Sequence, residues 1–206
     1  MEERCMGDVL IIHGTKTNGR DYREERVFSK HGTTFSFCFL TRIYSEYVES
    51  ILQRMVKDPP DVVIAGSCLW DITRWGPDGA EDYKKNVPRF FSGLQQRLPP
   101  TTLVMWLTAA PLSQEVRGGF LVPQLDFLKY SLRFHILEAN CFCKEAADKF
   151  GIDVLDLHFH LRFLLEHRAR DGIHWEPLAV RLCTNLVLTH VAISWGQTTA
   201  RKVRYR

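Results

Sequence analysis

Short apolar runs of β-type alternate along the chain with longer segments of helical periodicity. The strand-like runs are residues 34–40, 61–66, 102–107 and 152–157, and the helical segments are residues 44–57, 82–98, 127–150 and 176–195. This alternation predicts an α/β fold with a mostly parallel sheet and helices on both faces. Ligands bind such sheets at the carboxyl ends of the strands. The loops after Ala65, after Leu107 and between His158 and Trp175 are therefore the expected site.

The composition is that of one ordinary globular domain. Of the 206 residues, 45% are hydrophobic and 25% are charged, which excludes disordered and fibrous classes. The formal net charge of +3 does not favour a nucleic-acid partner. We expect the basic end, residues 201–206, to be a solvated terminus.

The sequence contains no clear targeting or cofactor motif. Its apolar runs are shorter than the ~20 residues of a membrane span, and the run at 9–12 is too short for a signal peptide. These patterns predict a cytoplasmic or nuclear location without membrane contact. The six cysteines form no CxxC pair, so we expect reduced thiols. No P-loop or dinucleotide fingerprint occurs, so no cofactor is predicted. The cysteines lack zinc-finger spacing, so no metal is predicted from them.

An aspartate and a histidine stand three residues apart before the last predicted helix, at Asp171 and His174. This spacing lets one loop supply two members of a Ser-His-Asp triad. The carboxylate fixes the imidazole tautomer, and the other ring nitrogen faces the nucleophile. The alternative is a surface turn in which Asp171 caps the backbone and His174 is solvated.

A second candidate segment, residues 65–76, leaves the end of a predicted buried strand. A loop of this kind can offer backbone N–H groups to an oxyanion. Its candidates for a substrate cleft or oxyanion hole are Gly66, Ser67, Trp70, Asp71 and Arg74. The alternative is that Trp70 and Trp75 anchor the core while Asp71 and Arg74 form a surface ion pair.

A third candidate segment contains Asp156, His158 and His160. If the segment is extended, strict alternation places all three side chains on one face. Imidazole and carboxylate groups suit zinc or iron. The alternative is that these side chains face solvent or hydrogen-bond to neighbours at the end of a strand.

Taken together, these segments resemble the PC-esterase domain-containing proteins, a branch of the SGNH/GDSL-like hydrolases. The most specific matches are Ser-Cys-Leu-Trp-Asp at 67–71 and Asp-Gly-Ile-His-Trp at 171–175. The matching stretches are residues 18–24, 39–48, 67–77, 118–121, 153–160 and 171–175. The resemblance implies a domain at 18–196, between a divergent segment at 1–17 and a tail at 197–206.

The resemblance implies a flavodoxin-like three-layer α/β/α sandwich. It also implies an ancestral acyl-ester hydrolase acting on an acylated small molecule or glycan. His174 would be the general base and Asp171 its orienting partner. These roles are expectations carried over from the family's Asp-x-x-His block.

The sequence departs from the family at the nucleophile. The family's serine lies in a Gly-Asp-Ser block at the end of the first strand, upstream of the stretch matched at 18–24. No Gly-Asp-Ser occurs here, since Gly7-Asp8 is followed by Val9. Gly66 also replaces an asparagine usual in the family, where related hydrolases place an oxyanion-hole side chain. Loss of such a donor typically lowers the rate by ~10²–10³-fold.

A missing first strand would leave unpaired backbone groups in the middle of the sheet. Either the run at 9–12 fills that position, which we favour, or the sheet closes up as a shortened domain.

Three hypotheses on function follow. The chain has lost hydrolysis, as a pseudoenzyme or a truncated product; or it is an esterase using Ser67 or Cys68; or it is a binding module whose cleft is lined by Trp70, Trp75 and Trp175.

Overall fold

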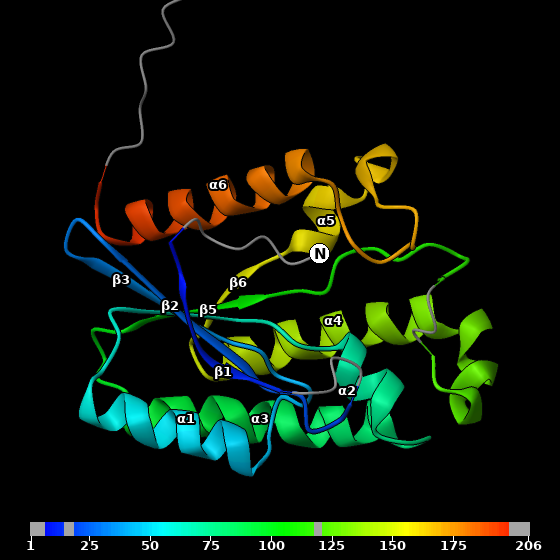
Figure 1. The fold of residues 1–206 in the computed structure, drawn as a ribbon, viewed down its shortest axis with the longest axis horizontal. Helices are drawn as coiled ribbons and strands as arrows, with labels where there is room; N and C mark the ends of the chain where they lie inside the picture. The colour runs from blue at the N-terminus through cyan, green and yellow to red at the C-terminus, as the bar shows by residue number, and fades with distance from the viewer. Residues whose placement is uncertain (1–6, 15–18, 118–120, 198–206) are drawn as a thin grey trace, which may run out of the picture.

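The computed structural model describes residues 7–14, 19–117 and 121–197 (Figure 1). Within these residues the chain has an α/β fold with two separate three-stranded sheets. The predicted basic tail, Asn18 and the matched positions 118–120 lie outside the described residues.

The parallel sheet consists of β4 (Val62–Ala65), β5 (Leu103–Leu107) and β6 (Asp153–Leu155), in that order. Its register pairs Val63 with Val104 and Trp106 with Val154. Three of the four predicted strands therefore form the parallel sheet that the apolar runs predicted. The strand predicted at 152–157 is shorter, because a helix begins at Leu157.

Helices cover both sides of the strands. The α-helices are α1 (Glu46–Lys57), α2 (Leu69–Arg74), α3 (Gly79–Arg97), α4 (Leu132–Lys149), α5 (Leu157–Leu161) and α6 (Pro177–Ser194). Two 3₁₀ helices, η1 (Pro123–Tyr130) and η2 (Leu165–His167), precede α4 and follow α5. Figure 1 shows α1, α3 and α4 on one side of the strands and α6 on the other.

Three predicted helices match the structure closely, and one is divided. Helix α1 begins after Ser45, whose side chain accepts a hydrogen bond from the Val48 amide, as an N-cap residue does. The single helix predicted at 127–150 is wrong at its start, because η1 and α4 meet at Ser131. Helix α4 ends as predicted before Gly151, which has a positive φ of 62°.

The core lies between the parallel sheet and the helices α1, α3 and α4. Trp106 of β5 is 1% exposed and packs edge-to-face on Phe91, with ring centroids 5.2 Å apart. In contrast, Ala179 is the one buried residue of α6. Among the described helices, α6 is the one whose length and apolar composition would also suffice for a membrane span.

The second sheet is an antiparallel meander of β1 (Val9–His13), β2 (Glu24–Lys30) and β3 (Thr33–Cys38). A two-residue turn joins β2 to β3, and both of its residues, His31 and Gly32, have positive φ. Such turns match the twist of a hairpin.

The prediction that residues 9–12 fill the first-strand position of the parallel sheet is wrong. Strand β1 pairs with β2, with Val9 opposite Val27, and its apolar side chains are largely exposed. The physical reason is local, because β2 is the next strand along the chain and offers an antiparallel edge. The alternative, in which the sheet closes up as a shortened domain, would pair the strand predicted at 34–40 with β4, but within the described residues that strand, β3, pairs with β2. In that part of the chain, β4 stays at the edge of the parallel sheet with Ile64 46% exposed.

Candidate functional site

The three predicted loops meet at the carboxyl ends of the parallel strands. A Cβ atom added to Gly66, after β4, would lie 3.0 Å from the Leu107 carbonyl oxygen, at the end of β5. The loop that follows β5 is bonded in turn to the loop before α6. The Ser113 amide donates to the Gly172 carbonyl, and the Arg117 amide donates to the Asp171 carbonyl, both at 2.9 Å. The fold thus brings together the segments that hold the candidate residues.

Asp171 and His174 form a hydrogen-bonded pair within one turn. His174 Nδ1 lies 2.5 Å from Asp171 Oδ2, and Asp171 Oδ1 accepts from the amides of Ile173 and His174. Gly172 makes the turn possible. Its φ is 80°, and an added Cβ would lie 2.6 Å from the Glu115 carbonyl oxygen. The predicted orienting contact is therefore present, together with the backbone capping of the alternative interpretation.

The ionised Asp171 carboxylate fixes the tautomer of the His174 imidazole. Partial burial raises the pKa of Asp171, but the hydrogen bonds from His174 and from two amides outweigh it and bring the pKa to about 2. An ionised carboxylate only accepts, so Nδ1 of His174 donates to it and Nε2 is left as the basic nitrogen. The His174 side chain is 56% exposed. This arrangement can remove a proton from a group that approaches Nε2.

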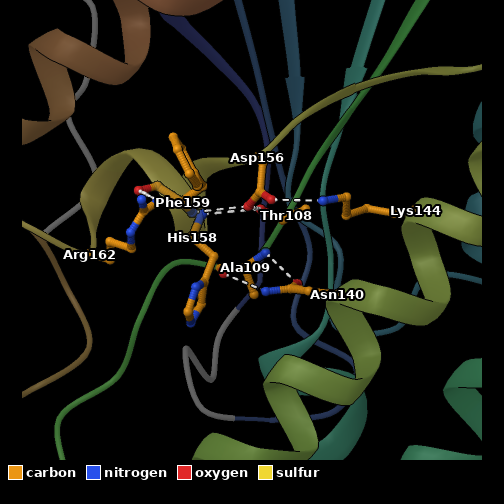
Figure 2. Close-up of polar contacts among 8 residues, drawn as sticks. All are labelled: Thr108, Ala109, Asn140, Lys144, Asp156, His158, Phe159 and Arg162. Atoms are coloured by element: carbon orange, nitrogen blue, oxygen red, sulfur yellow. Dashed lines mark hydrogen bonds and ion pairs between the residues drawn. The ribbon is translucent and has the colours of Figure 1, made fainter.

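A network of polar side chains anchors the ends of β5 and β6 (Figure 2). Thr108 Oγ1 donates to Asp156 at 3.0 Å, and Lys144 reaches the same carboxylate from α4 at 3.1 Å. Asn140 of α4 donates to the Ala109 carbonyl and accepts from the Ala109 amide, both at 2.9 Å. The network holds the loop after β5 in place.

One residue of this network, Asn140, has a signal in the sequence. Asn140 falls at helical spacing among Ile136, Cys143 and Ala147, which are buried in the core. A polar residue on an apolar helix face needs a buried partner. Its partner, the backbone of Ala109, lies 31 positions away in the chain, so no local pattern reveals it.

The extended segment predicted for Asp156, His158 and His160 is wrong. Asp156 is the N-cap of α5 and accepts from the Phe159 amide at 3.0 Å, so the two histidines lie in a helix. Residues two apart in a helix point in different directions. Figure 2 shows the His158 ring directed away from Asp156. Among the described residues, no three His, Cys, Asp or Glu side chains gather where a metal ion could bind.

Asp156 and His158 have opposite electrostatic surroundings. Burial raises the pKa of Asp156, but hydrogen bonds from Phe159, Lys144 and Thr108 outweigh it and lower the pKa overall. Burial is the main cause that lowers the pKa of His158. Asp156 is thus held ionised as a structural cap, and His158 is held neutral.

Ser67 and Asp71 bond to each other rather than to the Asp171–His174 pair. The Ser67 hydroxyl donates to Asp71 Oδ2, and Asp71 Oδ1 accepts from the Ile43 amide at 2.9 Å. Burial raises the pKa of Asp71 to about 6, although these bonds and the Arg42 charge act against it. The Ser67–Asp71 pair ties the loop after β4 to the segment before α1.

Cys68 is poorly suited to act as a nucleophile. It is 3% exposed, and burial raises the pKa of its thiol well above the usual value, with Cys143 and Asp71 adding to the effect. Only the thiolate attacks an ester carbon efficiently. The neighbouring Tyr83 hydroxyl donates to the Ser67 carbonyl and lies 3.1 Å from Cys143 Sγ. This cluster belongs to the core.

The surface ion pair considered for Asp71 and Arg74 is also wrong. Both residues are buried, at 2% and 8% exposure, and Asp71 is satisfied by Ser67 and Ile43. Arg74 instead lies over the ring of Trp70, 5.2 Å from its centroid. Helix α2 therefore contains two buried charged residues that do not neutralise each other.

Comparison with known sequences identifies close relatives. No protein-family model matches the chain. PC-esterase domain-containing protein 1A of Mus musculus is 46% identical over 187 residues, covering 89% of this chain and 41% of the relative. The same protein of Homo sapiens gives the same values. PC-esterase domain-containing protein 1B of Homo sapiens is 42% identical over 186 residues, covering 89% of this chain and 43% of the relative. The chain thus spans about two fifths of the length of these relatives.

Solved structures with the same fold are esterases of low sequence identity. A lipase/acylhydrolase from Enterococcus faecalis matches with a TM-score of 0.50 and 16% identity, over 70% of this chain and 69% of that one. The acetyl xylan esterase AlAXEase matches with a TM-score of 0.50 and 19% identity, over 74% and 78%. These likenesses show that the chain shares its α/β fold with these two esterases. By its sequence, the chain belongs to the family of PC-esterase domain-containing proteins.

Proposed function

We propose that the chain is an SGNH/GDSL-like family member that retains the Asp171–His174 pair but is impaired in acyl-ester hydrolysis. One observation carries the proposal. Among the described residues, no serine, threonine or cysteine side chain hydrogen-bonds to the His174 ring, whose one polar partner is Asp171. A triad needs its nucleophile within hydrogen-bond reach of the free ring nitrogen.

The two substitute nucleophiles weighed from the sequence are both engaged elsewhere. Ser67 donates its hydroxyl proton to a buried carboxylate, Asp71. The thiol of Cys68 is buried and has a raised pKa. Their contacts support the impaired state over an esterase built on Ser67 or Cys68.

The ligand class follows from the family and from the retained base. We propose that the site takes an acylated small molecule or glycan. A fold neighbour named as an acetyl xylan esterase supports an acyl ester on a sugar. The proposal concerns only the part of the relatives that this chain matches, which is about two fifths of their length.

The test is an esterase assay with p-nitrophenyl acetate on the purified chain and on His174→Ala. We expect equal, near-background turnover, because the imidazole has no nucleophile to activate. Ser67→Ala, with Ser92→Ala on α3 as its matched control, tests the substitute nucleophile. If the unchanged chain turns over the ester and His174→Ala does not, the proposal is refuted. If Ser67→Ala then loses turnover as well, while Ser92→Ala keeps it, Ser67 is the nucleophile.

A further inference from the structure

Arg74 is a buried cation without an anionic partner. It is the last residue of α2 and is 8% exposed, and its Nε atom is sealed from solvent without a hydrogen-bond partner. No carboxylate within the described part of the chain forms an ion pair with it. Burial, as the one cause, lowers the pKa of the guanidinium.

The contacts around Arg74 compensate for this burial only in part. The ring of Trp70, 5.2 Å from the guanidinium carbon, gives a cation–π contact, which is weaker than a buried ion pair. The nearest carboxylate along the chain, Asp71, is already bonded to Ser67 and Ile43. Buried charges in proteins are normally paired, so the unpaired guanidinium is evidence of a binding role.

The residue that follows Arg74 carries further positive charge on its ring. Arg42 lies 4.7 Å and Arg20 5.7 Å from the ring centroid of Trp75. The indole nitrogen of Trp75 donates to the Thr41 carbonyl at 2.7 Å, which fixes the ring. Only Arg42 of these two has a carboxylate partner among the described residues, Asp82 at 2.8 Å. The end of α2 therefore has an excess of cations on a rigid aromatic support.

We propose that Arg74 binds an oxyanion, the carboxylate or phosphate group of a small molecule. The planar guanidinium presents paired N–H donors that match two oxygens of such a group. Of the three guanidinium nitrogens of Arg74, Nε is the one that is both sealed and without a partner, so we assign the ligand contact to the two terminal nitrogens. The Trp70 ring supports the guanidinium through its contact at 5.2 Å. This inference does not depend on whether the chain hydrolyses esters.

The test compares sodium phosphate, sodium acetate and sodium chloride at equal ionic strength, with thermal unfolding and calorimetric titration as readouts. We expect phosphate, acetate or both to raise the melting temperature above the chloride value and to give saturable binding. Arg74→Met should bind roughly tenfold or more weakly, because a charge-assisted bidentate contact is lost. It should also melt higher than the unchanged chain in chloride, because the unpaired charge is gone. Arg181→Met, at an exposed position on α6, is the matched control and should respond as the unchanged chain does.

A response to phosphate alone assigns a phosphate group, and one to acetate alone assigns a carboxylate. Equal responses of the unchanged chain and Arg74→Met, or no response above chloride, overturn the proposal. If Arg74→Met does not fold, Arg74→Gln is compared with the unchanged chain in the same anion titrations. The nitrogen resonance of Arg74 Nε in the unchanged chain is an independent readout. It should shift on titration while that of Arg181 stays, and the absence of a shift also overturns the proposal.

Discussion

Asp71 gives the sharpest test of the electrostatics at the candidate site. Burial raises its pKa from 3.8 to about 6, and one pKa unit corresponds to about 1.4 kcal/mol. Between these values the folded chain keeps a proton that the unfolded chain has released. The free energy of unfolding therefore falls as pH rises from 4 to 7, and over this range the group lowers it by about 2.4 kcal/mol.

Asp71→Asn removes the charge and keeps the shape. The amide oxygen can still accept from the Ile43 amide, and the amide nitrogen can donate to Ser67 Oγ. We expect the free energy of unfolding of the variant to rise by about 2.4 kcal/mol relative to the unchanged chain between pH 4 and pH 7. The pKa of Asp171 is about 2, so its effect on stability falls mainly below pH 4. His158 titrates in both proteins. The difference in unfolding free energy between the variant and the unchanged chain therefore isolates Asp71.

The assay is urea unfolding followed by tryptophan fluorescence at pH 4, 5, 6 and 7. Asp78→Asn is the matched control, because Asp78 is exposed just before α3 and its side chain makes no capping hydrogen bond. Its difference from the unchanged chain should stay flat over this range. The reasoning is refuted if the Asp71→Asn difference is equally flat or declines toward pH 7.

Three further predictions concern the framework of the site. Gly172→Ala should lower the free energy of unfolding by about 2–3 kcal/mol in urea titrations, because the added Cβ meets the Glu115 carbonyl. Gly196 has a similar φ of 70° but open space around it, so Gly196→Ala should lower the free energy of unfolding clearly less. Equal losses in the two variants would contradict the steric argument. Asn140→Ala should cost about 2–4 kcal/mol, because both polar groups of Ala109 lose their partner, whereas exposed Asn185→Ala should change little. Iodoacetamide should label exposed Cys141 well before buried Cys68 and Cys143 in mass spectrometry of the native chain; early labelling of Cys68 would count against its burial.

The parallel strands and main helices were predictable because their signals are local. Apolar runs such as 102–107 mark strands that are buried by neighbouring helices, and the prolines after Leu98 end α3 where the pattern predicted. The Asp171–His174 contact was predictable for the same reason. Both residues lie in one turn, so their spacing alone brings them together.

Strand β2 and the polar network could not be predicted, because their partners are distant in the chain. Strand β2 begins with two glutamates and an arginine, which a sequence pattern assigns to the surface. In the fold Glu25 is 8% exposed, where it accepts from Tyr47 at 2.9 Å and from Arg54 at 2.8 Å. Only the tertiary structure supplies those partners. Asp71 also has a distant partner, the Ile43 amide at 2.9 Å, which the local pattern does not reveal.

The position of β1 bears on whether a serine at position 9 could act as the nucleophile. Val9→Ser would complete a Gly-Asp-Ser sequence after Gly7 and Asp8. However, Val9 is 60% exposed and pairs with Val27 in the antiparallel sheet, and β1 does not pair with β4 of the parallel sheet. A serine on β1 therefore lacks the framework that would hold it against His174, and effective catalysis needs that contact near 3 Å. We expect Val9→Ser to leave p-nitrophenyl acetate turnover at background and to resist labelling by a fluorophosphonate. Turnover or labelling in Val9→Ser that disappears in Val9→Ser/His174→Ala would show that the hairpin can reach the histidine, and that one side chain is all that the site lacks.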